Sequence, residues 1–268
     1  MAKVADTAPV VSTGFTLNKV VRRGFQKIAM YGIGTFGSLL NAFRVPIVID
    51  HRPDSFYEFG FFPRFRKLYG GWIKGNRQNN GGDLTRLFFL ILNTRQIFED
   101  GVPGDIVELG VYKGNSAAVF ADFARRYDRR LFLFDTFAGF DDRDIETSSK
   151  RVSRAFQDTS LEGVRALVGD ENVTYVQGFF PESCERTTMP DEVAIAHIDC
   201  DLHDPMKAAL ERFYPSMAPG GLIILHDYSS GYWPGATKAV DEFFADKPER
   251  PILMPDKSGT AIVRMPMR

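Results

Sequence analysis

Two short segments of the sequence end a largely apolar run on ionisable side chains. In the first, HIDCD, Asp199 and Asp201 stand two residues apart after residues 193–198. In the second, LIILHDYS, His226 and Asp227 follow four aliphatic residues. Carboxylate oxygens and imidazole nitrogens bind divalent metal ions, and they also serve as general acids and bases. These two segments are therefore the candidates for metal binding or proton transfer.

The apolar runs themselves predict how the two segments meet. Short buried runs of four to eight residues that alternate with helix-length segments indicate a parallel sheet built from right-handed crossover units. In such sheets ligands bind at the carboxyl ends of the strands, and neighbouring strands lie about 4.8 Å apart. We therefore expect Asp199, His226 and Asp227 to converge in one crevice.

A second candidate site lies near the first strand, in the segment VELGVYKGNSA. Glu108, Gly110 and Gly114 form a glycine-containing turn before a helix, where a ligand can approach the backbone and the helix N-terminus favours negative charge. A dinucleotide fingerprint would need glycines at Tyr112 and Asn115, so a pyrophosphate site is disfavoured. Glu108 suits an α-amino group instead.

An acid also ends the second strand. Asp135 closes the run LFLFD, and a carboxylate at this place can accept hydrogen bonds from the hydroxyls of a ribose. Together with the turn at Gly110, this arrangement describes a nucleoside that carries methionine better than it describes a dinucleotide. The alternative is a structural turn with a solvated aspartate.

The elements that must position these residues form an α/β domain over residues 83–268. We expect strands at 105–110, 131–135, 173–178, 193–199 and 222–227, followed by a C-terminal antiparallel hairpin from 251–255 and 259–265. The expected helices cover 84–101, 115–126, 150–167, 205–217 with Asp204 as N-cap, and 235–244.

Residues 1–82 read as an N-terminal extension that caps the pocket or contacts another subunit. The first eighty residues carry twelve Lys/Arg against four Asp/Glu, whereas the whole chain of 268 residues has a net charge of −1. These basic residues are scattered, which disfavours nucleic-acid binding. The apolar segment 28–40 is too short to span a bilayer, which leaves a peripheral membrane contact as a minority alternative.

The two cysteines, Cys184 and Cys200, have neither metal-type spacing nor a disulfide pattern, and no secretory signal is evident. We expect a cytoplasmic protein and a homo-oligomer.

Five segments together resemble a known family. GVPGDIVELGVYKGNSA, FDTFAGF, GFFPES, the long segment from HIDCDLHDP to GGLIILHDYS, and GATKAVDEFF occur in the order of the motifs of the macrocin O-methyltransferases. These enzymes transfer a methyl group from S-adenosylmethionine to sugar hydroxyls of natural products. The resemblance runs from about residue 84 to residue 244 and implies a Rossmann-like class I methyltransferase fold with a mostly parallel seven-stranded sheet.

The resemblance also implies roles for individual residues. Asp135 would hold the ribose, Gly178 and Phe179 would flank the adenine, and the remaining cofactor contacts would be Glu108, Gly110, Gly114 and Phe137. The metal of the family is Mg²⁺, which would be held by Asp199, His226 and Asp227.

This chain departs from the family at one of the three metal positions, because His226 stands where the family has an acid. An imidazole in place of a hard anionic oxygen weakens Mg²⁺ and shifts the preference toward Mn²⁺, Fe²⁺ or Zn²⁺. Alternatively no metal binds, and His226, with an ordinary pKa near 6.5, takes the hydroxyl proton as a general base. The catalytic candidates are therefore Asp199 and His226.

Three nearby residues keep open roles at this point. Asp201 is either catalytic or bonded to the following loop, His197 reads as a core histidine, and His203 is a base, a substrate contact or a loop residue. The expected activity is methyl transfer from S-adenosylmethionine to a hydroxyl of a sugar or another small acceptor, with a divalent metal (Mg or Mn) as a possible cofactor. A non-catalytic nucleoside-binding protein with the same fold is the alternative.

Overall fold

A computed structural model describes residues 83–145 and 155–267, a short helical stretch at 68–72, and residues 28, 32, 35, 36 and 74. The chain divides into two compact units, residues 1–55 and 56–268, and the description below concerns the second. Most of the expected N-terminal extension, including nearly all of segment 28–40, lies outside the described residues. Among the helices that are described, none combines the length and apolar character of a membrane span.

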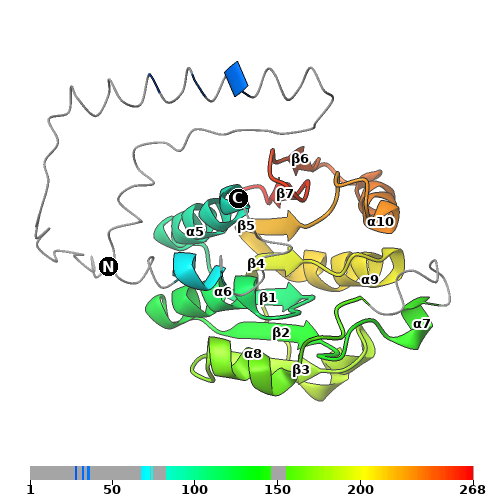
Figure 1. Cartoon of the computed structure of the whole chain (residues 1–268). Helices are drawn as coiled ribbons and strands as arrows, with labels where there is room; N and C mark the ends of the chain where they lie inside the picture. The colour runs from blue at the N-terminus through cyan, green and yellow to red at the C-terminus, as the bar shows by residue number, and fades with distance from the viewer. Residues whose placement is uncertain are drawn as a thin grey trace, which may run out of the picture. The chain divides into compact units, whose positions relative to one another are not determined.

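The sheet has seven strands in the order β3-β2-β1-β4-β5-β7-β6 (Figure 1). The strands β1 to β5 pair in parallel, and β7 runs antiparallel to both of its neighbours, β5 and β6. Their bounds are β1 Asp105–Leu109, β2 Leu131–Asp135, β3 Val173–Gln177, β4 Val193–Ile198, β5 Met217–Leu225, β6 Ile252–Leu253 and β7 Ala261–Arg264. This confirms the predicted mostly parallel sheet and its C-terminal antiparallel hairpin.

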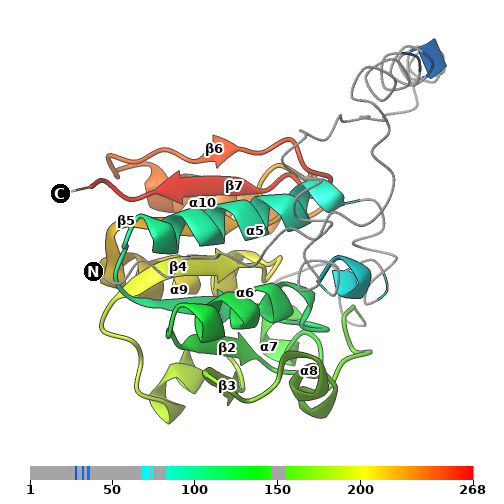
Figure 2. The same cartoon turned by 90° about the vertical axis from the view of Figure 1, so that its left-hand side faces the viewer.

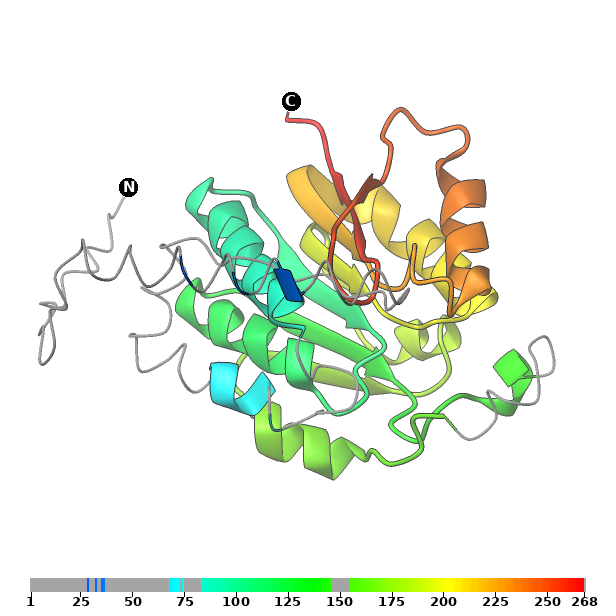
Figure 3. The ribbon, with the colours of Figure 1, turned by 45° about the horizontal axis from the view of Figure 1, so that its top comes forward.

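Helices cover both faces of the sheet (Figures 2 and 3). The helices α5 and α6 pack on one face, and α9 and α10 pack on the other. Their bounds are α5 Leu84–Glu99, α6 Asn115–Arg126, α9 His203–Phe213 and α10 Pro234–Phe244. Shorter helices are α7 Asp142–Ile145 and α8 Leu161–Val168, with 3₁₀ turns η1 Glu182–Arg186 and η2 Tyr214–Ser216.

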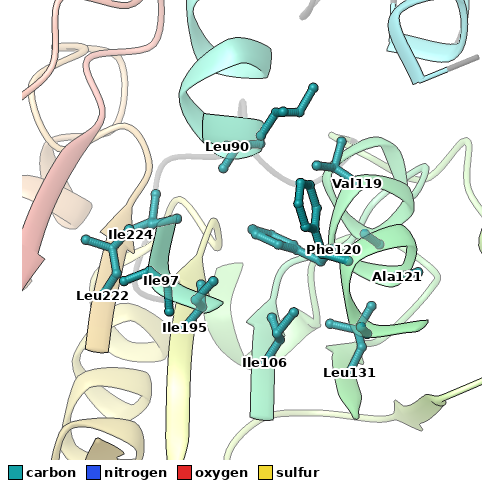
Figure 4. Close-up of a cluster of buried hydrophobic side chains, with 14 of the residues drawn as sticks. Leu90, Ile97, Ile106, Val119, Phe120, Ala121, Leu131, Ile195, Leu222 and Ile224 are labelled. Atoms are coloured by element: carbon teal, nitrogen blue, oxygen red, sulfur yellow. The ribbon is translucent and has the colours of Figure 1, made fainter. Parts of the chain in front are cut away.

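Each face of the sheet has its own hydrophobic core. On the first face, Leu90 and Ile97 of α5 and Phe120 of α6 lie over Ile106 and Ile195 of the sheet (Figure 4). On the second face, side chains of α9 and α10 pack against the opposite side of the same strands. Because successive strand residues point to opposite faces, a strand that is buried on both faces needs an almost continuous apolar run. This burial on both faces explains the short apolar sequence segments from which the sheet was predicted.

The helix predicted at 150–167 is confirmed over residues 161–167, whereas residues 155–160 are not helical and residues 150–154 lie outside the described residues. The structure has a helix only from Leu161, and Phe156 has a φ of 61°, which no right-handed helix accommodates. The helix begins where it does because the Ser160 hydroxyl accepts a hydrogen bond from the Gly163 N–H at 3.1 Å, as an N-cap residue does.

The helix predicted at 205–217 was misplaced by a few residues. Helix α9 begins at His203, so Asp204 lies in its first turn and Leu202 is the N-cap residue. The helix ends at Phe213, before the 3₁₀ turn that contains Pro215. An acid in the first turn still interacts favourably with the helix dipole, and a proline disrupts the interior of a helix because it has no N–H.

Candidate functional site

A pocket of about 530 Å³ lies at the carboxyl ends of the parallel strands. Its lining contains most of the predicted site residues, namely Gly110, Asp135, Gly178, Phe179, Asp199, Asp201, His226 and Asp227. Three predicted cofactor residues, Glu108, Gly114 and Phe137, lie outside this lining. The pocket therefore joins the two candidate sites of the sequence in one space.

The acidic and imidazole groups converge because β4 and β5 are adjacent and in register. Ile198 pairs with Leu225 at the last position of the two strands, so the next residues, Asp199 and His226, emerge side by side. The His226 backbone N–H donates to the Ile198 carbonyl at 3.0 Å. This confirms the predicted convergence at the strand ends.

His226 lies between two carboxylates. Its Nδ1 atom is 2.7 Å from Asp199 Oδ1 and 2.6 Å from Asp227 Oδ2. Burial and the Arg86 charge lower the pKa of this imidazole, but the two carboxylates outweigh them and raise it to about 9. In the same way, burial alone would raise the pKa of Asp199, yet the charges of His226 and Arg86 hold it well below its ordinary value. The pair is charged at neutral pH.

The same three residues offer a suitable donor set for a divalent ion. One ligand atom each from Asp199, His226 and Asp227 can be chosen so that all three lie within 4.8 Å of one another. Both ring nitrogens of His226 are buried and lack a well-directed hydrogen bond to any described residue, although Nδ1 is in ion-pair range. Unsatisfied buried nitrogens are costly unless something binds them. Two carboxylates and one imidazole fit Mn²⁺, Fe²⁺ or Zn²⁺ better than Mg²⁺.

Asp201 is a neighbour of this set rather than a member of it. Its side chain is buried, and burial together with the charges of Asp199 and Asp227 raises its pKa well above the ordinary value. Its backbone φ is 63°, and that of Asp227 is 60°. Non-glycine residues in this region cost free energy and cluster at functional sites. A neutral Asp201 can donate a hydrogen bond to the Asp227 carboxylate.

Helix α5 contributes a residue that the sequence analysis did not single out. Arg86 is 7% exposed, and its Nη2 donates to Asp199 Oδ2 at 2.7 Å. Trp72 lies against it, with the guanidinium carbon 5.7 Å from the ring centroid. In the sequence LTRLFFLIL, an arginine is expected on the solvent-facing side of an amphipathic helix. The only sequence feature that could have indicated a buried site is that this charge stands in an otherwise apolar segment.

His197 is part of a buried chain of polar groups behind the pocket. Its Nδ1 lies 2.8 Å from Glu108 Oε1, which also accepts from the Ser116 hydroxyl at 2.5 Å. Both His197 and Glu108 are fully buried. The interpretation of His197 as a core histidine is therefore supported. Glu108 Oε2 has no hydrogen-bond partner among the described residues.

Asp135 holds the loop that follows β1. Its Oδ2 accepts from the backbone N–H groups of Val111 at 2.6 Å and Tyr112 at 3.0 Å, and its Oδ1 accepts from Phe137 N–H at 2.7 Å. A carboxylate has about four lone-pair sites, and the fourth donor is the Thr136 hydroxyl, which lies 3.4 Å from Oδ1 and makes the longest of these contacts. Asp135 thus fixes the loop, and a ligand hydroxyl in the pocket that it lines would replace the Thr136 contact.

Packing alone already requires glycine at two positions of the turn. A Cβ atom at Gly110 would lie 1.9 Å from the Asp199 carbonyl oxygen, because β1 and β4 run so close together there. Gly114 has a φ of 79° at the N-cap of α6, and a Cβ there would meet Val164 at 3.0 Å. Only glycine fits at both positions.

The far wall of the pocket follows β3. Gly178 and Phe179 line the pocket, and the guanidinium of Arg143 lies 3.6 Å from the centroid of the Phe179 ring. Phe137, by contrast, is 4% exposed and belongs to the core beside Tyr175.

Two further features of the pocket were missed in the sequence. Asn115 lines it, and neither polar atom of the Asn115 amide has a hydrogen-bond partner among the described residues. Three aromatic side chains, Phe140, Phe156 and Trp233, also line it and contact one another, with ring centroids 5.4 to 6.3 Å apart. They come from three separate loops, so no local sequence pattern predicts that they lie together.

His203 lies away from this chemistry. It is outside the pocket lining, and its ring nitrogens contact Asp204 at 2.7 Å and Glu242 at 3.0 Å. These hydrogen bonds raise its pKa. His203 is the first residue of α9 rather than a loop residue, and its contact with Glu242 joins α9 to α10.

Comparison with known proteins resolves the family. The model of the macrocin O-methyltransferases (TylF) matches residues 84–263, which is more than half of the chain. The chain belongs to this family. The match begins at the first residue of α5 and ends within β7, so it covers the sheet up to this last strand and much of the pocket lining, but not Trp72.

Individual relatives share 29–30% sequence identity with the chain over the matched residues. The chain is 30% identical over 164 residues to the mycinamicin III 3''-O-methyltransferase of Micromonospora griseorubida, which covers 54% of this chain and 61% of that protein. It is 29% identical over 166 residues to the 8-demethyl-8-(2,3-dimethoxy-alpha-L-rhamnosyl)-tetracenomycin-C 4'-O-methyltransferase of Streptomyces olivaceus, with the same coverage of 54% and 61%. The chain thus spans about six tenths of the length of the curated relatives that it matches.

Solved structures agree on the fold. The O-methyltransferase NovP superimposes with a TM-score of 0.59 at 26% identity, over 68% of this chain and 79% of NovP. The calicheamicin methyltransferase CalS11 gives a TM-score of 0.51 at 21% identity, over 82% of this chain and 98% of CalS11. The Rossmann-like class I methyltransferase fold is therefore confirmed.

Proposed function

We propose that this protein transfers a methyl group from S-adenosylmethionine to a hydroxyl group of a sugar or a similar small acceptor. The observation that carries this proposal is the meeting of Asp199, His226 and Asp227 in the same pocket as the Asp135 loop. One relative is named for a 4'-O-transfer on a rhamnosyl-bearing tetracenomycin, which supports a sugar as the acceptor.

The cofactor half of the pocket suits a methionine-bearing nucleoside. Asp135 accepts from the ribose, and the adenine lies beside Gly178 and Phe179. Asn115, the first residue of α6, offers its unsatisfied amide near a helix N-terminus, where a carboxylate is favoured. Glu108 is buried outside the lining, so its effect on the cofactor passes through Ser116, which does line the pocket.

The residues at the ends of β4 and β5, in the acceptor half of the pocket, would deprotonate the acceptor hydroxyl and align it with the methyl donor. Asp199, His226 and Asp227 would hold a divalent ion, which when bound lowers the pKa of a coordinated hydroxyl. Asp199 and Asp227 position the acceptor oxygen in line with the methyl donor, and Asp199 or His226 receives the proton.

A metal-independent reaction is the second candidate, because Nδ1 of His226 already contacts both carboxylates. With a pKa of about 9, this imidazole is mostly protonated at neutral pH. Metal-independent turnover would therefore increase as the pH rises toward 9.

The test combines calorimetry with product analysis. S-adenosylhomocysteine binding is titrated with and without Mn²⁺ or Mg²⁺, and methyl transfer to a library of glycosides is followed by mass spectrometry. Methylation that EDTA abolishes and Mn²⁺ restores supports the metal-assisted reaction. Methylation that persists in EDTA supports His226 as the base. Cofactor binding without transfer to any acceptor contradicts the proposed activity.

The variant His226→Asp separates these alternatives further. A third carboxylate supplies the hard anionic ligand that Mg²⁺ prefers, so Mg²⁺ affinity should rise at least about tenfold, or about 1.4 kcal/mol. Isothermal titration with Mg²⁺ measures this change, with His226→Asn as the matched control. An unchanged Mg²⁺ affinity would count against a metal site.

A further inference from the structure

Arg86 is a buried cation at the edge of the acceptor site. It lies in the first turn of α5, and its side chain is 8% exposed. The Asp83 side chain accepts from its backbone N–H at 3.2 Å, which fixes this turn. Trp72 covers the guanidinium, and its own Nε1 donates to the Asp83 carbonyl at 3.0 Å. The position of Arg86 is thus determined from two sides.

A buried guanidinium is costly unless its charge is compensated. The compensation comes from Asp199, whose Oδ2 is 2.7 Å from Nη2 of Arg86. The same nitrogen is 3.4 Å from His197 Nε2. Arg86 therefore links the acceptor site to the buried chain of His197 and Glu108.

The two oxygens of Asp199 have different partners. Oδ2 faces Arg86, and Oδ1 faces His226 at 2.7 Å. Because Oδ2 already accepts from the Arg86 cation, Oδ1 is the oxygen that is turned toward His226 and toward a ligand beside it. Arg86 therefore decides the orientation of the residue on which the acceptor chemistry depends.

The charges in this group are nearly balanced without any further ion. Asp199 and Asp227 carry two negative charges and Arg86 carries one positive charge, whereas His226 must lose its proton to bind a metal ion and then carries none. A divalent cation would therefore meet a site of net charge −1 that already contains a cation. Coulomb repulsion between Arg86 and the ion acts within a buried region, where water screens it little.

We propose that Arg86 is a positioning residue of the acceptor site, whose guanidinium fixes Asp199 by one oxygen and weakens divalent-metal binding at the other. This inference rests on the metal triad of the proposed function. It predicts a site that takes up and releases its metal readily, in contrast to a site with acids at all three positions.

The experiment measures Mn²⁺ affinity in the full-length protein saturated with S-adenosylhomocysteine. Free Mn²⁺ is followed by electron paramagnetic resonance at one fixed pH in the wild type, Arg86→Met and Arg86→Lys. Arg95→Met is the matched control, because Arg95 lies on the same helix but is exposed and pairs with Glu99. The thermal unfolding midpoint and the affinity for S-adenosylhomocysteine verify that each variant is folded.

Removing the charge should tighten Mn²⁺ binding at least about tenfold in Arg86→Met. Arg86→Lys and Arg95→Met should stay within about twofold of the wild type, because both keep the buried positive charge. Should Arg86→Met fail to fold, Arg86→Gln, which can still donate to Asp199, serves the same comparison. The proposal is overturned if the Mn²⁺ affinity of Arg86→Met differs from that of the wild type by less than about twofold while its thermal unfolding midpoint changes. Arg86 would then be a purely structural residue.

The outcome is separable from that of the proposed function. Wild-type protein that methylates no glycoside, together with tighter Mn²⁺ binding in Arg86→Met, leaves the role of Arg86 intact and contradicts the activity. Methylation by the wild type without any Mn²⁺ binding in either protein contradicts the role of Arg86 and leaves the activity intact.

Discussion

At the scale of single residues, the acceptor site is defined by how charge is distributed among four side chains. Asp199 contacts both Arg86 and His226, and His226 contacts both Asp199 and Asp227. Removing any one of them leaves a buried charge with fewer partners. Variants here should therefore be isosteric where possible, so that lost chemistry is not confused with lost folding.

Asp199→Asn should abolish turnover and spare the cofactor. The amide keeps a hydrogen-bond acceptor for Arg86 but can neither take a proton nor bind a metal well, so kcat should fall by about 10²–10⁴-fold. The S-adenosylhomocysteine dissociation constant should stay within about twofold, as measured by calorimetry. In Asp135→Ala the cofactor affinity should fall instead. Equal loss of both properties in Asp199→Asn would refute this division of labour.

The charged His226 should make stability depend on pH when metal is removed. Its pKa is raised from 6.5 to about 9, so the folded state binds this proton more tightly than the unfolded state does. The stabilisation is complete below about pH 6.5 and is lost as the pH rises through about 9, by up to about 1.4 kcal/mol per pH unit. Urea unfolding in EDTA measures it.

The matched variant for this measurement is His226→Asn, which has no titratable group at that position. Its free energy of unfolding should vary less between pH 7 and pH 9 than that of the wild type. Parallel curves for the two proteins would mean that His226 is not protonated in the folded, metal-free state.

At the scale of elements, the sequence predicted strands better than helix ends. Asp199 and His226 were located correctly because apolar runs between helices specify both the strands and their carboxyl ends. Residues 155–160 of the helix predicted at 150–167 were not, because the left-handed conformation of Phe156 depends on its aromatic neighbours Tyr112, Phe140 and Trp233 and not on local propensity. Tertiary contacts of this kind have no signature in a single sequence.

The start of α5 is the element on which Arg86 depends. In Asp83→Ala the side-chain acceptor for the Arg86 N–H is lost, which should cost about 1 kcal/mol in the free energy of unfolding. Denaturant unfolding measures the loss. Asp83→Asn retains a capping oxygen and should lose less than half as much. An equal loss in both variants would indicate that the carboxylate charge, rather than the cap, is what matters.

At the scale of the whole described domain, the sheet lies between two hydrophobic cores, and the pocket lies at the carboxyl ends of its parallel strands. Arg86 and Trp72 could not be predicted as pocket residues, because a charge on a helix usually faces solvent and residue 72 precedes the family match. The predicted domain boundary at residue 82 stays a prediction, although Trp72 packs in the same unit as the sheet.

The core on the α5 and α6 face should contribute strongly to stability. Phe120 is fully buried and lies 5.4 Å from the His197 ring. Phe120→Ala should lower the free energy of unfolding by about 3–5 kcal/mol. Leu167→Ala on α8, where Leu167 is 48% exposed, should change it by less than about 0.5 kcal/mol. Similar losses in the two variants would contradict the assignment of this core.

Trp72 has a consequence for how ligands can be observed. The sequence contains two tryptophans, and both Trp72 and Trp233 line the pocket. Trp72 contacts the guanidinium of Arg86, whereas Trp233 lies among the aromatic rings of the opposite loops. The intrinsic fluorescence of the protein is therefore an optical signal from two walls of a single cavity. With Trp233→Phe and Trp72→Phe, the emission from each wall could be followed separately as the pocket fills.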